Sequence, residues 1–230
     1  MKNSEYYDLL VEEIIADLTA NLRLKQFTKN SALIGAFAEE SVNELIHNVV
    51  SPLRVSTGSV ISRYLLEGEK ELPQIDCIIW NPSPLPALFS KGNFGLIPFA
   101  NSLGIIEIKS SNYSGVGKKI ESVLLRENEL VDEAPPNATR SQGKIKLIPD
   151  KEPKSLGVIC LYDSSKVDNK LTELIESKKV SVILEHTGDF ELKPSRIGIL
   201  NLISFLGKIR KRAILSDGNK NIAVDMINET

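Results

Sequence analysis

The sequence predicts an α/β fold, with a central mixed β-sheet flanked by helices on both faces. In the second half of the chain, apolar strand-like runs such as "LGVICLYD" and "VSVILEH" alternate with amphipathic helical segments. Strands that are apolar on both sides are typical of a sheet covered on both faces. The length of 230 residues and the hydrophobic content of 42% fit one domain, residues 1–230, with a sizeable core.

Two helices are expected at the start of the chain. Apolar residues at helical spacing predict the first over Ser4–Leu24, within an N-terminal extension of residues 1–28, and the second over Ser31–Val50. Pro52 ends the second helix. We expect the first helix to cap the sheet, with an interface to another protein as the alternative.

The middle of the chain predicts strands joined by turn-rich segments. Residues 53–62 and 74–80, separated by the polar turn "EGEKE", favour a hairpin or meander. The Pro- and Gly-rich residues 81–102 indicate a loop. A strand then ends at Lys109, and a helix follows over residues 114–128.

Residues 129–154 have little periodicity and many turn formers, which predicts a long mobile loop, with a short hairpin inside it as the alternative. The remaining elements are expected as a strand over 156–163, a helix over 166–179, a strand over 180–186 and a final helix over 194–212.

Several classes of protein and site are disfavoured. No run approaches the roughly 18 apolar residues of a membrane helix, and the acidic N-terminus does not resemble a secretory signal. Cys77 and Cys160 lie in apolar runs and are expected to be buried reduced thiols, which indicates the cytoplasm. His47 and His186 have no partner at ligand spacing.

Basic side chains are not spread over the whole chain. The net charge of -2 argues against a nonspecific coat for nucleic acid but not against a local basic groove. The segment "SGVGKK" lacks the full spacing of a phosphate-binding loop. A basic cluster, "KIRKR", occupies residues 208–212. It could contact phosphates, or it could simply be a solvated helix end, where cations suit the helix dipole. Candidate phosphate contacts are Lys118, Lys119, Lys208, Arg210, Lys211 and Arg212.

The strand "GIIEIKSS" interrupts its apolar residues with an acid and a base. Side chains alternate along a strand, so Glu107 and Lys109 share one face, while Ile106 and Ile108 occupy the other. A carboxylate buried in such a strand is costly unless it has a partner or a cation.

A second acid occurs in the strand "QIDCIIW". Alternation places Gln74, Asp76 and Ile78 on one face, and Ile75 and Cys77 on the other. Together with Glu107 and Lys109, Asp76 could form a buried ion-pair cluster that has a purely structural role.

A third acid borders the apolar face of the second helix. Glu39 lies at the edge of the apolar stripe, whereas Glu40 and Glu44 fall on the solvent side. Gly35 is expected where this helix approaches another backbone. Two or three carboxylates with a lysine form a hard oxygen site for Mg²⁺ or Mn²⁺, which suits phosphodiester hydrolysis.

The order of these residues resembles the PD-(D/E)xK phosphodiesterase superfamily, and more closely an uncharacterised bacterial family within it. The matching motifs are "GAFAE" for Glu39, "QID" for Asp76, and "EIK" for Glu107 and Lys109. The resemblance covers roughly residues 30–210. It departs in having isoleucine before the aspartate and a long insertion between the two strands, which must loop out of the sheet.

The resemblance implies a restriction-endonuclease-like fold and a divalent-metal-dependent endonuclease. Asp76, Glu107 and the backbone carbonyl of Ile108 would hold Mg²⁺ or Mn²⁺, and Lys109 would assist the attacking water. Glu39 would support the metal or its water shell.

Further implications concern the substrate and setting. Gln74 would contribute to the site from the same face as Asp76. Duplex DNA is the favoured substrate over RNA and over branched or single-stranded DNA, in restriction or phage defence. The protein is expected to act as a homodimer, since cutting both strands needs two sites, or beside a partner protein. The alternative is a catalytically inactive nucleic-acid-binding or assembly subunit of the same fold.

Overall fold

The computed structural model covers the chain from residue 1 to residue 230. The residues it describes are 8–9, 11–16, 28–61, 74–82, 86–98, 101–132, 137–141, 144–148, 154–164, 168–187 and 191–228. Within these ranges, side-chain surroundings are described except at 126–132, 137–141, 144–148, 186–187, 191–192 and 214–228.

An eight-stranded mixed sheet forms the centre of the molecule, in the order β10-β9-β8-β5-β2-β1-β4-β3. β2 pairs antiparallel with both β1 and β5, and β5 pairs parallel with β8. This confirms the predicted α/β class. The strands are β1 (Arg54–Ile61), β2 (Ile75–Trp80), β3 (Phe89–Lys91), β4 (Phe94–Pro98), β5 (Ser102–Lys109), β8 (Ser155–Asp163), β9 (Val180–Thr187) and β10 (Glu191–Pro194).

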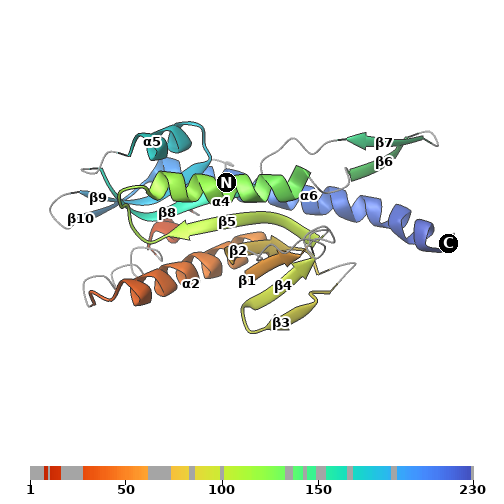
Figure 1. Cartoon of the computed structure of the whole chain (residues 1–230), viewed down its shortest axis with the longest axis horizontal. Helices are drawn as coiled ribbons and strands as arrows, with labels where there is room; N and C mark the ends of the chain where they lie inside the picture. Colours follow the sequence, from red (N-terminus) through yellow and green to blue (C-terminus); the bar gives the residue numbers. More distant parts are fainter. Residues whose placement is uncertain are drawn as a thin grey trace.

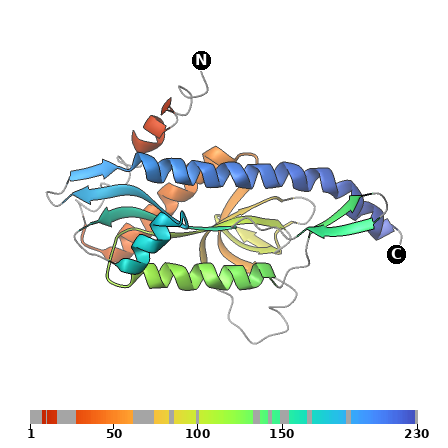
Figure 2. The same ribbon diagram turned by 90° about the horizontal axis from the view of Figure 1, so that it is seen from above.

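Helices cover both faces of this sheet (Figures 1 and 2). α2 and α6 share one apolar core with inward residues of β2, β5 and β8, whereas α4 and α5 share a second core with β8 and β9 on the other face. The helices are α2 (Ser31–Val50), α4 (Val116–Asp132), α5 (Asn169–Glu176) and α6 (Arg196–Asn228).

α2 has the bounds that the sequence predicts. Asn30 caps its start, because the side-chain oxygen accepts hydrogen bonds from the amides of Ala32 at 3.1 Å and Leu33 at 3.2 Å. Val42 and Ile46, four residues apart on one face, are fully buried against the sheet. This face packs α2 onto β1, β2 and β5, and the last two of these strands carry the candidate site.

The prediction that residues 81–102 form only a loop is wrong. They contain the antiparallel hairpin β3–β4. Its second strand, β4, pairs in parallel with β1 on the side away from β2. Gly92, with φ of 58°, supplies the turn, and Glu40 on α2 accepts a hydrogen bond from Asn93 at 3.0 Å. The insertion therefore extends the sheet edge and leaves β2 and β5 adjacent, as expected.

Two further segments differ from the sequence prediction. α4 continues to Asp132, and the hairpin β6 (Asn137–Ser141) with β7 (Lys144–Ile148) follows, which confirms the alternative expected for residues 129–154. α6 continues past the predicted end at residue 212, since residues 213–228 contain no proline to stop it. The hairpin lies beside the end of α6 in both views (Figures 1 and 2).

The described part of the N-terminal segment is helical at residues 8–9 and 11–16, and the rest of Ser4–Leu24 lies outside the described residues. Val11 and Ile14 are buried in the core that α2 and α6 share. Asp8 forms an ion pair with Arg196 at the start of α6. These contacts pack this part of the helix against the core that α2 and α6 share.

Both cysteines are buried free thiols, as expected. Burial, with a smaller contribution from the charge of Glu39, raises the pKa of Cys160 to about 12. Burial also raises the pKa of Cys77. In the part of the chain that the structure describes, none of the helices is both long and apolar enough to cross a bilayer.

Two glycines allow opposite stability predictions. A Cβ at Gly35 would have no described atom within 4 Å, so no described segment makes the close approach expected there, whereas one at Gly58 would lie 2.0 Å from the Gly95 carbonyl oxygen, at φ of 146°. Urea unfolding should show Gly35→Ala more stable by about 1 kcal/mol, through helix propensity. Gly58→Ala should be less stable by at least about 2 kcal/mol. A destabilised Gly35→Ala would show that another segment packs there.

Candidate active site

β2 and β5 bring the three charged residues of the predicted site to one level of the sheet. The strands run antiparallel with Cys77 opposite Ile106, so the preceding residue of β2, Asp76, comes level with Glu107. Lys109 is two residues further along β5 and points to the same face as Glu107. The topology therefore assembles the cluster from residues that lie far apart in sequence.

The contacts within this cluster are direct. Asp76 Oδ2 accepts a hydrogen bond from the amide of Ile108 at 2.8 Å and lies 3.5 Å from Lys109 Nζ. The Lys109 ammonium also contacts Glu107 Oε1 and donates to the Ile108 carbonyl at 3.1 Å. The side chains of Asp76, Lys109 and Glu107 are 14%, 14% and 6% exposed, so the cluster is only partly open to solvent.

Asp76 lies in a β-bulge of β2, where the pairing with β1 shifts. Ser56 of β1 lies opposite Ile78, and Gly58 lies opposite Ile75, so β2 advances three residues where β1 advances two. As a result Ile75 packs in the same apolar cluster as Ile78, and the prediction that they occupy opposite faces is wrong. Bulges are frequent beside active sites, and this one adjoins Asp76.

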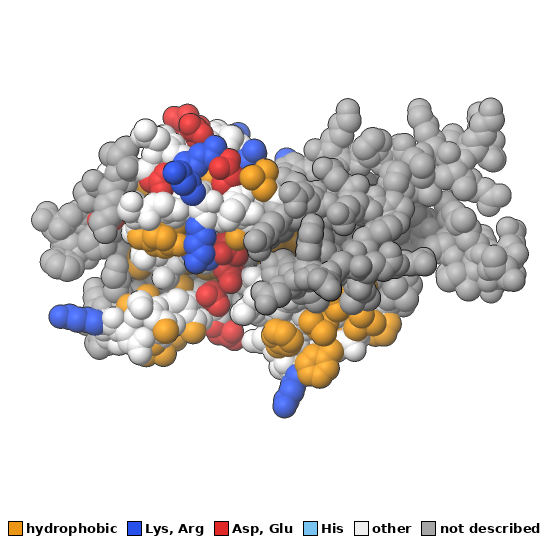
Figure 3. Space-filling view, in the orientation of Figure 1, with side chains coloured by type: hydrophobic (Ala, Val, Ile, Leu, Met, Phe, Trp, Pro, Cys, Tyr) orange, Lys and Arg blue, Asp and Glu red, His pale blue; other side chains and the backbone are white. Residues whose placement is uncertain are grey.

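Glu39 joins the cluster through its charge. It is half-buried on α2; burial and the charge of Asp76 raise its pKa, which Glu107 raises further and Lys109 lowers. Glu40 and Glu44 are exposed, as predicted. On the face drawn in Figure 3, acidic side chains with a basic one beside them cross the region of β5 and α2.

The cluster carries more negative than positive charge. Burial and the charge of Asp76 raise the pKa of Glu107, and the hydrogen bond from Lys109 only partly offsets this. Burial alone would lower the pKa of Lys109, but its hydrogen bond to Glu107 and the charge of Asp76 raise it overall. Lys109 therefore stays an ammonium donor, and the carboxylates would gain from a further cation.

The donor set fits a hard divalent cation. No group of three His, Cys, Asp or Glu side chains in the described ranges has the arrangement of a ready metal cage. Mg²⁺, however, is commonly held by one or two carboxylates, with waters and substrate phosphates completing its shell. Asp76, Glu107 and the Ile108 carbonyl offer such donors, and the Lys109 ammonium now contacts all three. Binding of a cation would require this ammonium to move aside.

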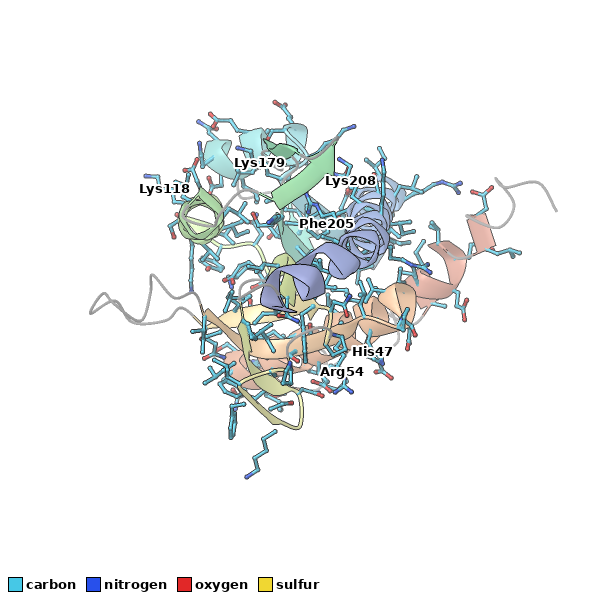
Figure 4. All side chains as sticks on the ribbon, turned by 90° about the vertical axis from the view of Figure 1, so that its right-hand side faces the viewer. His47, Arg54, Lys118, Lys179, Phe205 and Lys208 are labelled. Carbon is cyan, nitrogen blue, oxygen red and sulfur yellow. The ribbon has the colours of Figure 1, made fainter. Side chains whose placement is uncertain are left out.

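Among the described residues, neither Gln74 nor the basic candidates take part in the contacts that form the cluster. Gln74 is exposed just before β2 and makes no hydrogen bond to Asp76, Glu107 or Lys109, all of which the structure describes. Lys118 on α4 and Lys208 on α6 lie on opposite sides of the molecule (Figure 4). One surface therefore does not contain both basic groups. Of the remaining basic candidates, Lys119, Arg210 and Lys211 are exposed and Arg212 is half-buried.

Two groups of residues near the site are not predicted by the sequence. Asn43 and Thr57 bind the backbone carbonyl of Asp76, and the only sequence signal is a polar residue inside the apolar stripe of α2. A cavity of about 300 Å³ begins one residue beyond Lys109, and its lining carries four hydroxyl groups and one ammonium. It is lined by Thr28, Lys29, Ser31, Ile34, Ser110 and Ser111.

The fold is similar to solved structures of NucC. The chain matches NucC of P. aeruginosa ATCC27853 in its cAAA-bound form with 13% identity and a TM-score of 0.56, covering 90% of this chain and 91% of that one. It matches E. coli MS115-1 NucC with 14% identity in the cAAA-bound form (TM-score 0.56, 90% of each chain) and in the apo form (TM-score 0.53, 90% and 92%). No family model and no curated protein matches the sequence. At this identity the likeness establishes the fold.

Proposed function

We propose that this chain is a divalent-metal-dependent nuclease that hydrolyses phosphodiester bonds of DNA. The observation that carries the proposal is the cluster of Asp76, Glu107 and Lys109, assembled between the adjacent strands β2 and β5. The resemblance of its motifs to the PD-(D/E)xK superfamily and the NucC-like fold support it. A setting in restriction or phage defence follows from the resemblance.

Each residue of the cluster has a role in this proposal. Asp76, Glu107 and the Ile108 carbonyl would hold Mg²⁺ or Mn²⁺, which when bound would polarise the scissile phosphate and acidify the attacking water. Lys109 remains protonated, so it donates hydrogen bonds to the water or to the charge that develops on phosphate oxygens. Glu39, at the edge of the cluster, would orient the water shell.

A second candidate is a catalytically inactive nucleic-acid-binding or assembly subunit of the same fold. The observation in its favour is that the Lys109 ammonium contacts both Asp76 and Glu107, so each of these carboxylates has a cationic partner within the protein. In this alternative the cluster is a partly buried ion-pair network that holds β2 against β5, and the fold would serve as a scaffold.

The proposed substrate is duplex DNA, and the proposed assembly is a homodimer or a complex with a partner protein, because cutting both strands requires two sites. Two of the similar NucC structures are cAAA-bound. We therefore include cAAA among the conditions in which activity is measured.

The deciding experiment is cleavage of supercoiled plasmid, linear duplex, single-stranded DNA and RNA, in EDTA, Mg²⁺ or Mn²⁺, with and without cAAA. Wild type should cut duplex DNA with metal, and Asp76→Asn should lose at least about 100-fold of this activity. Millimolar metal should also raise the melting temperature of wild type but not of Asp76→Asn. Glu44→Gln, an exposed acid on α2, is the matched control and should behave as wild type.

The outcomes separate the two candidates. Metal-induced stabilisation without cleavage of any nucleic acid would favour a nuclease that needs a partner. If wild type neither cuts nor gains stability with metal in any condition, the nuclease is excluded and the inactive subunit remains.

A further inference from the structure

The backbone carbonyl of Asp76 is held by side chains from two other elements. The Thr57 hydroxyl on β1 donates to it at 3.0 Å, and Asn43 Nδ2 on α2 donates at 3.1 Å. Asn43 Nδ2 also lies 3.4 Å from Thr57 Oγ1, so the three groups form a closed network. At a bulge, backbone groups leave the regular ladder and need other partners, which this network supplies.

The same network ties together the two elements that carry acids of the site. Asn43 follows Glu39 by four residues on α2, so both lie on the same side of the helix. Its hydrogen bond to the Asp76 carbonyl fixes α2 against β2. Loss of this bond would change the position of Glu39 relative to Asp76 as well as the orientation of Asp76 itself.

Asn43 is a poor choice for stability alone. It is 9% exposed, and its Oδ1 is buried with no hydrogen-bond partner among the residues that the structure describes. Its neighbours along the apolar side of α2, Val42 and Ile46, are fully buried. A buried polar atom without a partner opposes folding, so an apolar side chain of similar size would suit the core better.

We propose that Asn43 and Thr57 are positioning residues that set the direction of the Asp76 carboxylate. They act through the Asp76 backbone, at the bulge, and hold Oδ2 where it accepts from the Ile108 amide and lies close to Lys109. The inference rests on the proposed function, since the carboxylate they orient is the proposed metal ligand. Neither residue contacts the substrate.

The Ile108 amide gives a direct readout of Asp76 that needs neither metal nor DNA. It donates to Asp76 Oδ2 at 2.8 Å, so its hydrogen exchange reports whether the carboxylate is in place. In EDTA, the double variant Asn43→Leu/Thr57→Val should exchange this amide at least about 10-fold faster. The Ile105 amide is the internal reference, because it lies on the same strand as Ile108 but donates to the Lys154 carbonyl at 2.8 Å. Its exchange rate should stay at the wild-type value.

Further readouts test the consequence for the site. The double variant should bind Mn²⁺ about 10–100-fold more weakly by calorimetry, as for loss of groups that orient a ligand. In the nuclease assay kcat should fall with KM for DNA unchanged, and Thr57→Ser should retain wild-type values because it keeps the hydroxyl. Asn48→Leu, at an exposed asparagine of the same helix, is the matched control.

Each outcome decides the inference. If all β5 amides exchange faster in the double variant, the substitutions have loosened the whole strand. The measurement is then made on Thr57→Val alone, which removes only one hydroxyl from the network. Unchanged Ile108 exchange in a folded variant overturns the inference, whatever the cleavage result. Faster Ile108 exchange in the double variant, together with a wild-type protein that neither binds Mn²⁺ nor cuts DNA, supports the positioning role and excludes the proposed function.

Discussion

Replacement of Lys109 by methionine should reduce metal-dependent cleavage by about 10²–10⁴-fold, the usual contribution of a positioned proton donor or charge stabiliser. Methionine keeps the apolar part of the side chain but removes the ammonium that contacts Asp76 and Glu107. The comparison is a plasmid-nicking time course at saturating Mg²⁺. Lys91→Met, at an exposed lysine on β3, is the matched control and should cut as wild type does.

The same variant distinguishes a catalytic from a structural lysine. In EDTA the carboxylates of Asp76 and Glu107 lose their cationic partner. The loss of folding stability should approach about 3–5 kcal/mol, the range for removal of one partner of a buried ion pair. Millimolar Mg²⁺ should recover most of this stability, because the divalent ion replaces the lost positive charge, yet cleavage should stay low. A loss of stability that Mg²⁺ does not recover, or cleavage at the wild-type rate, would show that Lys109 serves only the fold.

The sequence predicts the elements of the fold where local pattern is strong. α2 follows the sequence because its apolar stripe, the Asn30 cap and Pro52 all agree. The hairpin β3–β4 is missed because its strands are short, β4 contains a glycine and a proline, and the pairing of β4 with β1 depends on contacts distant in sequence. The end of α6 is missed because a basic cluster resembles a helix end without being one.

The candidate site is predictable in its residues but not in its geometry. Asp76, Glu107 and Lys109 are identified from charge inside apolar strands, and the structure brings them together. Strict alternation fails at Ile75, because a bulge inserts a residue that no local pattern marks. Asn43 is missed for a related reason: its partner is a backbone carbonyl on another element, and only the assembled sheet places it there.

Glu107→Gln should inactivate the protein and, in EDTA at neutral pH, make the fold more stable. Activity should fall at least about 100-fold because the proposed metal ligand and its charge are lost. Stability should rise because burial and the charge of Asp76 raise the pKa of Glu107 above its ordinary value of 4.5. Charging this side chain therefore costs more free energy in the folded protein than in the unfolded chain.

The sign of this effect fixes its pH dependence. A carboxyl with a raised pKa binds its proton more tightly in the folded state, so wild-type stability falls as pH rises through the folded-state pKa. The gain from Glu107→Gln should thus be present at pH 8 and disappear below about pH 4.5, where Glu107 is protonated in both states. Urea unfolding in EDTA at several pH values measures it, with Glu185→Gln, an exposed glutamate on β9, as the matched control.

Added Mg²⁺ should reverse the order of stability of wild type and Glu107→Gln. Mg²⁺ binds the ionised carboxylate, so added Mg²⁺ should stabilise wild type increasingly as pH rises and leave Glu107→Gln almost unchanged. A variant that is less stable than wild type in EDTA at pH 8 would show that the ion pair between Glu107 and Lys109 outweighs the cost of burying the carboxylate. The balance of charge at this cluster would then favour the structural subunit over the nuclease.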